Sequence, residues 1–345
     1  MKTAVMTGIG QMAFEDRPVP VPGPHEVLVR IENVGICGSD LHYFETGRIG
    51  DYIVEPPFVL GHEAAGTVTE VGDQVTHLVP GDRVALEPGI TCGKCEFCKS
   101  GKYNLCPDVV FFATPPIDGT FQEYVTHPAD LCFKLPDYVS TLEGALIEPL
   151  AVGFHAARQG GAQLGQIAVV FGSGCIGLVS MMALKAMGLA EVYVVDVLDT
   201  RLAKAAELGA TGVINGMNAN PVDEVNRLTG GRGCDLVIET SGTGIAADQA
   251  VRIARKGGTI VMVGYGTSGT VTLPMSLALD KELRFETVFR YRHIYPLAIQ
   301  AVADGRVNLK GIVTHTFAFD DVQQAMDASI SDKATIVKAM VEIGG

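Results

Sequence analysis

The sequence contains no tryptophan, and aromatic residues make up only 7% of the chain. Basic residues are also scarce, because 26 Lys and Arg stand against 39 Asp and Glu, which leaves a formal net charge of −13. Since a surface this acidic repels phosphate backbones, we expect no nucleic-acid partner. The chain also lacks an apolar run of about 18 residues and an export-type N-terminus, so we expect no membrane segment and a cytoplasmic location.

The remaining composition is that of a folded, two-domain protein. Hydrophobic residues account for 47% of the 345 residues and charged residues for 19%, which excludes a disordered chain and a coiled coil. This length favours two domains with substantial cores. Because no export signal is visible, we expect the eight cysteines to stay reduced rather than form disulfides.

The sequence pattern changes near residue 148. Before this point, short strands at 26–31, 65–71 and 83–86 are separated by glycine and proline, which predicts a mostly β, barrel-like domain over 1–148. After it, apolar strands alternate with amphipathic helices, which predicts a doubly wound parallel sheet over 149–289. Residues 290–345 read as irregular up to a closing strand at 335–341, and we expect them to return to the first domain. The expected elements of the second domain are strands at 166–171, 191–196, 235–239 and 259–263 and helices at 176–187, 200–208 and 247–254.

A glycine-rich turn joins the first strand of the second domain to its first helix. Gly172, Gly174 and Gly177 have the G-x-G-x-x-G spacing that brings the backbone close to a pyrophosphate at a helix N-terminus. Asp196 ends the next strand, where a carboxylate accepts hydrogen bonds from a ribose diol and repels a 2′-phosphate. The complete strand–helix–strand context therefore predicts NAD in preference to NADP. Arg201 either stacks on the adenine or is an exposed residue at a helix start.

Four cysteines, Cys92, Cys95, Cys98 and Cys106, follow one another at short spacing in a lobe at about 89–108. This spacing is typical of a closed, tetrahedral zinc site. Because four protein ligands leave no open position, we expect a structural zinc that ties down the lobe. A zinc ribbon that binds nucleic acid is the alternative, and the net charge argues against it.

A second set of metal-ligand residue types is scattered along the first domain. Cys37, His62, Glu63 and Glu148 each have an ordinary structural explanation, as a core cysteine or a buried, paired group. However, the first three lie beside glycines that clear space, and hydride transfer requires a Lewis acid or a proton relay near the nicotinamide. The spacing alone leaves a catalytic metal site and purely structural roles equally open.

Several segments resemble the zinc-dependent medium-chain alcohol dehydrogenases, and within them the polyol branch of sorbitol and xylitol dehydrogenases. The segments that carry the resemblance are 35–43 (GICGSDLHY), 61–66 (GHEAAG), the four-cysteine lobe, 112–116 (FATPP), 147–153 (IEPLAVG) and 288–291 (VFRY). The last three are closer to polyol dehydrogenases than to simple alcohol dehydrogenases, and the resemblance covers essentially the whole chain. It implies a GroES-like catalytic domain, a Rossmann domain and a homotetramer.

The resemblance also implies roles for individual residues. Cys37, His62 and Glu63 would lie at a catalytic zinc, and Glu148 would either bind the metal or hold a water on it. Ser39 and His42 resemble a proton relay through the cofactor ribose, although a surface histidine remains the alternative for His42. The implied substrate pocket consists of Tyr43, Phe112, Thr114, Arg290 and Tyr291, and the implied cofactor contacts include Ile176, Val263, Gly264, Val288, Phe289 and Arg290.

These observations predict a zinc- and NAD-dependent polyol dehydrogenase. The expected reaction oxidises the C2 hydroxyl of xylitol or sorbitol to the 2-ketose, because zinc lowers the pKa of the hydroxyl while hydride passes to the nicotinamide. One alternative is a threonine or butanediol dehydrogenase, which shares the zinc residues. Another is a dinucleotide-binding protein that has lost catalysis, but no damage to Cys37, His62 or Glu148 is visible in the sequence.

Overall fold

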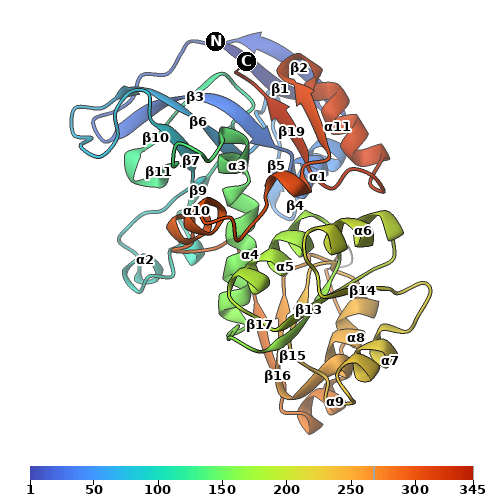
Figure 1. The fold of residues 1–345 in the computed structure, drawn as a ribbon. Helices are drawn as coiled ribbons and strands as arrows, with labels where there is room; N and C mark the ends of the chain where they lie inside the picture. Colours follow the sequence, from blue (N-terminus) through green and yellow to red (C-terminus); the bar gives the residue numbers. More distant parts are fainter. Residues whose placement is uncertain (267–268, 345) are drawn as a thin grey trace. The chain divides into compact units, whose positions relative to one another are not determined.

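A computed structural model of the chain describes residues 1–266 and 269–344. The chain divides into two compact units, drawn in Figure 1. The first comprises Met1–Glu148, Tyr295–Ala303 and Val313–Gly345, and the second comprises Pro149–Ile294 and Asp304–Ile312. Residues 290–294 and 304–312, which the sequence boundaries assigned to the return segment, therefore group with the second unit.

The first unit is built on a seven-stranded sheet in the order β11-β7-β6-β3-β19-β18, with β10 also paired to β3. Its strands are β3 (Glu26–Gly35), β6 (Glu63–Val71), β7 (Arg83–Leu86), β10 (Tyr124–Pro128), β11 (Cys132–Lys134), β18 (His315–Ala318) and β19 (Ala339–Glu342). Two-stranded sheets pair β1 (Lys2–Gly8) with β2 (Gln11–Asp16), β4 (Arg48–Ile49) with β5 (Tyr52–Ile53), and β8 (Gly89–Ile90) with β9 (Val110–Phe111). Val27, Val29 and Ile31 alternate along β3 and are fully buried, as the period of two predicts.

The sequence analysis predicted no helix in the first unit, but the structure has several. They are α1 (Gly38–Thr46), α2 (Glu96–Lys99), α3 (Thr141–Ala145), α10 (Tyr295–Ala303) and α11 (Val322–Ser331), and α4 (Ile147–Gln159) starts at the end of this unit's first segment. The interpretation of the chain after residue 290 as irregular is therefore wrong. Pro296 lies in the first turn of α10, where a missing N–H costs no helical hydrogen bond. The closing strand is also shorter than expected, because β19 begins at Ala339.

The second unit contains a six-stranded parallel sheet in the order β14-β13-β12-β15-β16-β17. Numbered along the chain, this is the 3-2-1-4-5-6 order of a Rossmann fold, which confirms the predicted fold class. The strands are β12 (Ile167–Phe171), β13 (Glu191–Asp196), β14 (Gly212–Asn215), β15 (Cys234–Glu239), β16 (Ala254–Met262) and β17 (Arg284–Thr287). The helices are α5 (Cys175–Ala186), α6 (Asp199–Glu207), α7 (Pro221–Leu228), α8 (Gly244–Ile253) and α9 (Met275–Asp280).

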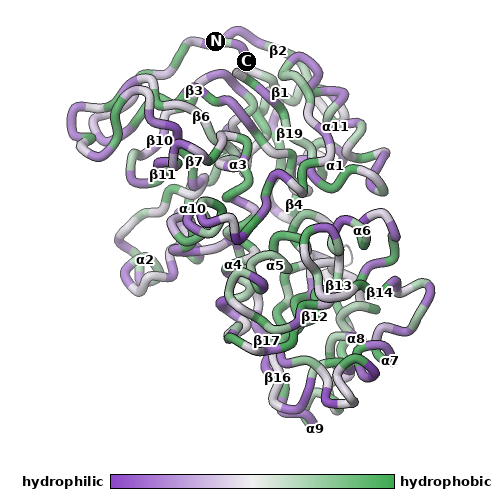
Figure 2. The backbone as a smooth tube through the Cα atoms, viewed as in Figure 1, coloured by the Kyte–Doolittle hydropathy of each residue, from purple (hydrophilic) through white to green (hydrophobic). Residues whose placement is uncertain are grey.

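Each unit has a hydrophobic core of its own. The core of the first includes Val29, Phe44 and Phe121, together with Met326 from α11. The core of the second unit includes residues of its parallel strands and of α8. Figure 2 shows hydrophobic residues concentrated along α5 and polar residues along much of α7. Across the part of the chain that the structure describes, no helix combines the length and apolar character required to cross a bilayer.

Candidate zinc and dinucleotide sites

Three of the four scattered ligand candidates come together where β3 ends and β6 begins. Cys37 is the N-cap of α1, directly after β3, while His62 and Glu63 stand at the start of β6. The cysteine sulfur, a ring nitrogen of the histidine and a carboxylate oxygen of the glutamate lie within 4.8 Å of one another. This set of one sulfur, one nitrogen and one oxygen donor fits a zinc ion and leaves a fourth position for another ligand.

A buried carboxylate that the sequence analysis did not single out organises this cluster. Asp40 is fully buried, and its Oδ2 accepts a hydrogen bond from the backbone N–H of Cys37 (3.0 Å) while Oδ1 accepts one from Gly61 (3.0 Å). Oδ1 also lies 3.6 Å from Nδ1 of His62. A carboxylate beside one ring nitrogen orients a histidine whose other nitrogen binds a metal. The sequence signal was an Asp three residues after the N-cap, the position of a capping box.

The ionisable groups in this cluster shift one another's pKa. Burial lowers the pKa of His62, but the negative charges of Asp40 and Cys37 outweigh it and raise this pKa well above its ordinary value. Burial likewise opposes ionisation of Asp40, and attraction to His62 outweighs it, so the pKa of Asp40 is lowered. The site therefore concentrates negative charge, as a cation-binding site requires.

Glu63 has a cationic partner that the sequence analysis missed. The ammonium Nζ of Lys338 donates hydrogen bonds to Oε1 (2.8 Å) and Oε2 (2.5 Å) of Glu63, and both side chains are at most 2% exposed. The same Nζ donates to the carbonyl oxygen of Ile36 (2.9 Å). The available signal was a single lysine inside the apolar stretch 336–341.

Glu148 lies in the first turn of α4 and is buried, but among the described residues it does not belong to the group whose ligand atoms meet within 4.8 Å. Its negative charge acts on a second buried carboxylate. Burial, and then repulsion from Glu148, raises the pKa of Glu87 to about 7. Tyr103, which lies inside the four-cysteine lobe, donates a hydrogen bond to Oε1 of Glu87 (2.7 Å). Two buried acidic groups thus lie near one another at the end of β7.

The residues of the first unit that the resemblance assigns to a proton relay or to the substrate pocket differ in how buried they are. Ser39 is half-buried and His42 is exposed, both on α1. Tyr43 is buried among core residues, with its ring 6.5 Å from that of Phe58. Phe112 and Thr114 are half-buried in the loop after β9, and the Phe112 ring lies 4.8 Å from that of His127.

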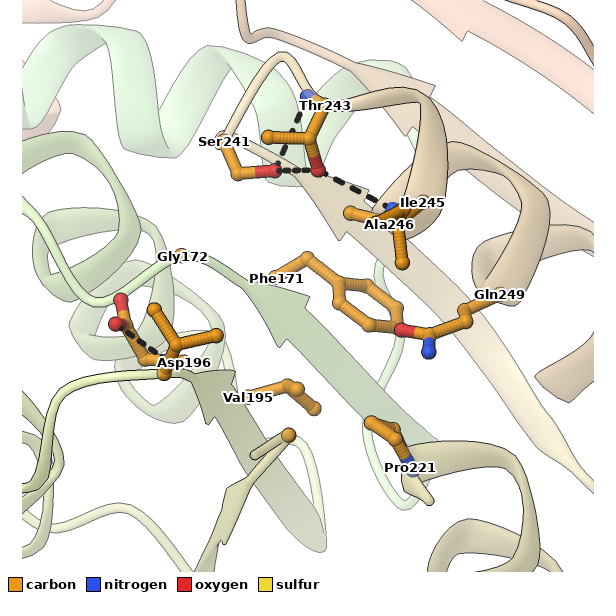
Figure 3. A pocket seen from close by; sticks show the side chains of 12 residues that line it. Phe171, Gly172, Val195, Asp196, Pro221, Ser241, Thr243, Ile245, Ala246 and Gln249 are labelled. Carbon is orange, nitrogen blue, oxygen red and sulfur yellow. Dashed lines mark hydrogen bonds between the residues drawn. The ribbon is translucent and has the colours of Figure 1, made fainter. Parts of the chain in front are cut away.

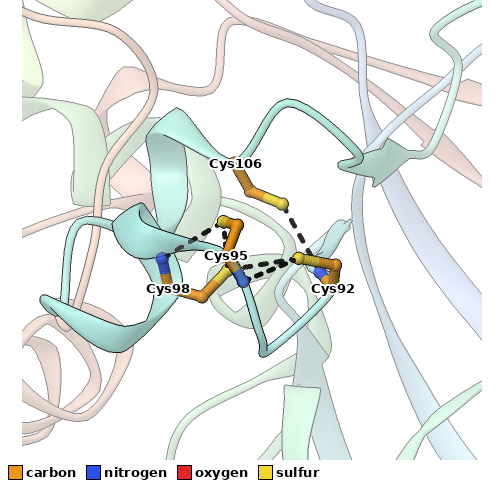
Figure 4. Close-up of side chains that lie close together, drawn as sticks. All are labelled: Cys92, Cys95, Cys98 and Cys106. Carbon is orange, nitrogen blue, oxygen red and sulfur yellow. Dashed lines mark hydrogen bonds between the residues drawn. The ribbon is translucent and has the colours of Figure 1, made fainter.

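The four cysteines of the lobe converge on one point, as Figure 4 shows. Their sulfur atoms lie within 4.8 Å of one another, with 3.4 Å between Cys95 and Cys98. Backbone N–H groups of Cys95 and Cys98 donate to the sulfurs of Cys92 and Cys95, respectively, at 3.4 Å. Backbone hydrogen bonds from Lys94 and Cys95 lower the pKa of Cys92 to about 7. Four converging sulfurs of this kind fit a tetrahedral zinc ion with no open position.

The glycine-rich turn has the geometry that a pyrophosphate requires. Gly172 follows β12 with a positive φ of 91°, and a Cβ on Gly177 would lie 1.9 Å from the Gly172 carbonyl oxygen. Gly174 is the N-cap of α5, and Ile176 lies half-buried in the first turn of that helix. The backbone at this turn is therefore close-packed, and the N-terminus of α5 is available to an anion.

A pocket of about 240 Å³ opens at the carboxyl ends of β12 and β13, as Figure 3 shows. Gly172, Val195, Asp196, Pro221 and Ile245 are among its lining residues. The carboxyl ends of parallel strands next to the point where the strand order reverses are where doubly wound sheets bind nucleotides.

Asp196 does more than line this pocket. Its Oδ2 accepts a hydrogen bond from the backbone of Ser173 (2.6 Å), and Oδ1 accepts from the backbones of Val197 (2.7 Å) and Leu198 (3.0 Å). The carboxylate therefore ties the glycine-rich turn to the end of β13. Arg201 is half-buried rather than exposed, and its Nη1 lies 3.7 Å from where a Cβ on Gly174 would stand.

The other predicted cofactor residues also lie past the ends of strands in the second unit. The backbone N–H groups of Val263 and Gly264 donate to the carbonyl oxygen of Glu239 (2.8 and 3.0 Å). Val288 is buried directly after β17, and Phe289 is exposed with the Arg290 guanidinium 4.8 Å from its ring centre. Tyr291 is buried. These residues share the carboxyl edge of the parallel sheet with the pocket described above.

Fold and donor sets together define a zinc-binding dehydrogenase, with the candidate metal ligands in the first unit and a Rossmann nucleotide-binding fold in the second. Residues 23–137 match the alcohol dehydrogenase GroES-like domain, and residues 175–304 match the zinc-binding dehydrogenase domain. The chain belongs to the zinc-dependent medium-chain alcohol dehydrogenases, in their polyol branch.

Individual relatives agree with this assignment. The sorbitol dehydrogenase of Macaca fascicularis is 47% identical over 325 residues, which cover 94% of this chain and 91% of the relative. A solved oxidoreductase/dehydrogenase of unknown specificity from Escherichia coli superimposes with a TM-score of 0.96 at 42% identity, covering 100% of this chain and 99% of that one. The 2R,3R-butanediol dehydrogenase of Bacillus subtilis superimposes with a TM-score of 0.91 at 32% identity, covering 99% of each chain.

Proposed function

We propose that the protein is a zinc- and NAD-dependent polyol dehydrogenase that oxidises the C2 hydroxyl of xylitol or sorbitol to xylulose or fructose. The main support for this proposal is the donor set of Cys37, His62 and Glu63. Its sulfur, nitrogen and oxygen atoms have the chemistry of a catalytic zinc site with one coordination position left open. The 47% identity to a sorbitol dehydrogenase, against 32% to a butanediol dehydrogenase, favours a polyol as the substrate.

In this proposal Cys37 and His62 hold the catalytic zinc, with Glu63 and Glu148 as the carboxylates that serve its remaining positions. When bound, zinc supplies the Lewis acidity that lowers the pKa of a substrate hydroxyl. Asp40 orients the His62 ring and ties the Cys37 and Gly61 backbones to it. The four cysteines of the lobe hold a second, structural zinc. The proposal leaves open which of the two carboxylates binds the catalytic ion directly.

Polar side chains of the protein must carry away the substrate proton and bind the substrate hydroxyls. We assign Ser39 and His42 to a relay that carries the proton towards solvent, which the exposure of His42 supports. Glu148 is the other acid–base group. Arg290 and Tyr291 are proposed to bind substrate hydroxyls, with Tyr43, Phe112 and Thr114 as the pocket wall. A site that hydrogen-bonds hydroxyls discriminates strongly against analogues that lack them.

NAD is the proposed cofactor because Asp196 lies at the end of β13, beside the glycine-rich turn. A carboxylate there binds the ribose diol and disfavours a 2′-phosphate. Ile176, Val263, Gly264 and the residues 288–290 complete the proposed cofactor contacts. On the resemblance to the family alone, we further propose that the protein is a homotetramer and lies in the cytoplasm. Light scattering of the purified protein tests the oligomeric state.

The direct test is NADH formation, followed by absorbance, with xylitol, sorbitol, threonine and butanediol as substrates. We expect turnover of a polyol that is lost after chelation and restored by added zinc. Cys37→Ser should abolish turnover, whereas Cys132→Ser, a buried cysteine in β11 of the same unit, is the matched control that should retain it. Preferred turnover of threonine or butanediol would overturn the substrate assignment. No turnover of any of the four by protein with bound zinc and NAD would favour the non-catalytic alternative.

A further inference from the structure

The pocket at the carboxyl ends of β12 and β13 has apolar walls that come from either side of one strand. In the sheet, β12 lies between β13 and β15. Val197 directly follows β13, while Ile245 lies in the first turn of α8, the helix after β15. Both residues line the pocket, and they are 56% and 74% exposed. A ligand with apolar faces that entered between them would remove this surface from water.

Most polar side chains of this pocket already have partners within the protein. The polar side chains that line it are Asp196, Ser241, Thr243 and Gln249. Asp196 accepts the three backbone hydrogen bonds described above. The Ser241 hydroxyl donates to Oε1 of Glu239. It also lies 3.1 Å from the Thr243 hydroxyl, which accepts from the backbone N–H of Ala246 (3.2 Å), as Figure 3 shows. Both hydroxyls therefore serve the turn that begins α8.

Gln249 differs from the other polar residues of the lining. It is half-buried in α8, four residues after Ile245, so both residues lie on the face of the helix that borders the pocket. Within residues 1–266 and 269–344, its side-chain amide has no hydrogen-bond partner. Figure 3 shows Gln249 and Asp196 on opposite sides of the pocket, with the Phe171 side chain between them in this view. The pocket thus has a ribose-binding carboxylate on one side and an amide that can pair with a ligand on the other.

On the basis of the proposed use of NAD, we propose that Gln249 is a specificity-determining residue that selects adenine as the base of the nucleotide. Its amide oxygen accepts a hydrogen bond from the N6 amino group, and its NH2 group donates to N7, which is the pairing that a glutamine makes with adenine in nucleic-acid recognition. Val197 and Ile245 contact the apolar faces of the ring. The ribose, attached at the end of the base away from the amino group, then lies at Asp196.

This pairing distinguishes adenine from hypoxanthine, which has a carbonyl oxygen in place of the amino group. Hypoxanthine presents two acceptors on the same edge, so the amide oxygen of Gln249 faces one of them in either orientation of the amide. A site that pairs with a polar group of its ligand rejects an analogue that leaves the site's own group unpaired. A glutamine that was merely solvated on the surface of α8 would create no such preference.

The experiment measures base preference by isothermal titration calorimetry of the zinc-containing protein with ADP-ribose and with inosine diphosphate ribose, its hypoxanthine counterpart. We expect the unmodified protein to bind ADP-ribose at least about tenfold more tightly. Gln249→Leu should bind the two within about twofold of one another, because the variant binds ADP-ribose more weakly. Asp248→Leu is the matched control and should keep the preference, since Asp248 pairs with Arg252 (2.7 Å) and does not line the pocket.

A second variant keeps the test decisive if Gln249→Leu does not fold. Gln249→Glu retains an acceptor for the N6 amino group but has no NH2 group to donate to N7. We therefore expect it to bind both nucleotides more weakly than the unmodified protein while still preferring ADP-ribose, because a carboxylate also repels the carbonyl oxygen of hypoxanthine. A purely structural role of Gln249 would weaken both nucleotides equally in both variants.

Either of two results overturns the inference. One is equal binding of ADP-ribose and inosine diphosphate ribose by the unmodified protein. The other is a preference for ADP-ribose that persists unchanged in Gln249→Leu. The calorimetric readout is independent of turnover, so a failure of the proposed reaction, seen as no oxidation of any polyol, is distinguishable from a failure of this inference. No binding of ADP-ribose by the unmodified protein would overturn both the cofactor assignment and the role of Gln249.

Discussion

Asp196 combines two features in one carboxylate, since it lines the pocket at the carboxyl ends of β12 and β13 and accepts three backbone hydrogen bonds. The two can be separated by substitution. Asp196→Asn keeps an oxygen for the Val197 and Leu198 amides but removes the charge that repels a 2′-phosphate. Changing the exposed Val197 to Arg in addition supplies a cation for that phosphate.

We therefore expect Asp196→Asn/Val197→Arg to shift the ratio of kcat/KM for NAD to that for NADP towards NADP by about 100-fold, the effect of losing one repulsive and gaining one attractive interaction of about 1.4 kcal/mol each. Steady-state kinetics with both cofactors measures this ratio. Val197→Arg alone is the control and should shift the ratio less. An unchanged NAD preference in the double variant would remove Asp196 from the ribose site.

Glu87 provides a test in which stability depends on pH. Burial and the charge of Glu148 raise its pKa from 4.5 to about 7, so the folded state binds this proton more tightly than the unfolded state does. The stabilisation is complete below pH 4.5 and is lost as the pH rises through about 7. At pH 8 the ionised Glu87 thus costs about 3 kcal/mol relative to acidic pH.

Glu87→Gln removes this titration while leaving an oxygen for the Tyr103 hydroxyl. We expect the free energy of unfolding to fall less between pH 5 and pH 8 in the variant than in the unmodified protein, as denaturant titrations at the two pH values can measure. Glu96→Gln, an acidic residue in α2 of the lobe, is a control that should keep the original dependence. If the free energy of unfolding of Glu87→Gln fell with pH as much as that of the unmodified protein, another group would be responsible for the pH dependence.

Lys338, which sequence reasoning missed, has partners that are distant in the chain. Lys338 is separated from Ile36 by 302 positions and from Glu63 by 275, so no local pattern reveals the contact. The ligand types Cys37, His62 and Glu63 could be identified from their motifs, because those motifs are local. Their convergence within 4.8 Å depends on the antiparallel register of β3 and β6, which residue spacing does not specify.

The four-cysteine lobe is an element whose stability we expect to depend on a bound metal. Its regular structure consists of the two-residue strand β8, the helix α2 with Cys95 as N-cap, and a single turn at residues 103–105, none of which buries a substantial core. The four cysteine sulfurs lie within 4.8 Å of one another, so a metal that they share would be the main interaction joining these short elements. The lobe is consequently expected to lose its order when one ligand is removed.

For Cys95→Ser we expect the loss of one zinc per chain and a decrease of about 4 kcal/mol in the free energy of unfolding, in the range typical of a lost metal. Turnover per folded molecule should fall much less. Metal analysis, calorimetry and kinetics on the same preparation measure the three quantities. Ser100→Ala in the same lobe is the control, since Ser100 contributes only an exposed hydrogen bond to Phe97. Full stability of Cys95→Ser without its zinc would contradict the structural role.

Secondary structure followed the sequence where the hydrophobic period was uninterrupted. The strands at 83–86 and 191–196 occur at the predicted positions, and α5 lies within one residue of its predicted ends. The prediction of irregular structure failed after residue 290, because Pro296 occupies the first turn of α10, where a proline does not interrupt a helix. β19 starts later than predicted because residues 332–335 form a turn, in which the backbone N–H groups of Thr335 and Ile336 donate to the carbonyl oxygen of Asp332.

At the scale of the whole molecule, the strand order of the parallel sheet follows from general rules, whereas that of the first unit does not. Alternating strands and helices with a glycine-rich first turn imply the doubly wound class. In the first unit, β3 pairs with strands from three separate parts of the chain, β6, β10 and β19. Such long-range pairing depends on side-chain packing and is not encoded in any local motif.

Because each unit has its own core and its own ligand residues, metal and nucleotide should stabilise different parts of the chain. Hydrogen exchange followed by mass spectrometry can locate both effects. We expect NAD to slow exchange at 172–178 and 195–198, where backbone N–H groups surround the glycine-rich turn and Asp196. At a concentration 100 times its Kd, a ligand stabilises the state that binds it by about 2.7 kcal/mol.

Chelation should instead accelerate exchange at 35–38, 61–64 and 92–106, which contain Cys37, His62 and the four cysteines. The backbone N–H groups of Cys37 and Gly61 are informative reporters, because both donate to Asp40, whose position depends on His62. Adding zinc back provides the control for irreversible unfolding. Acceleration that reached the six-stranded sheet of the second unit as strongly as these segments would contradict the assignment of both metals to the first unit. Acceleration confined to 92–106 would assign the removable metal to the lobe and argue against a metal at Cys37 and His62.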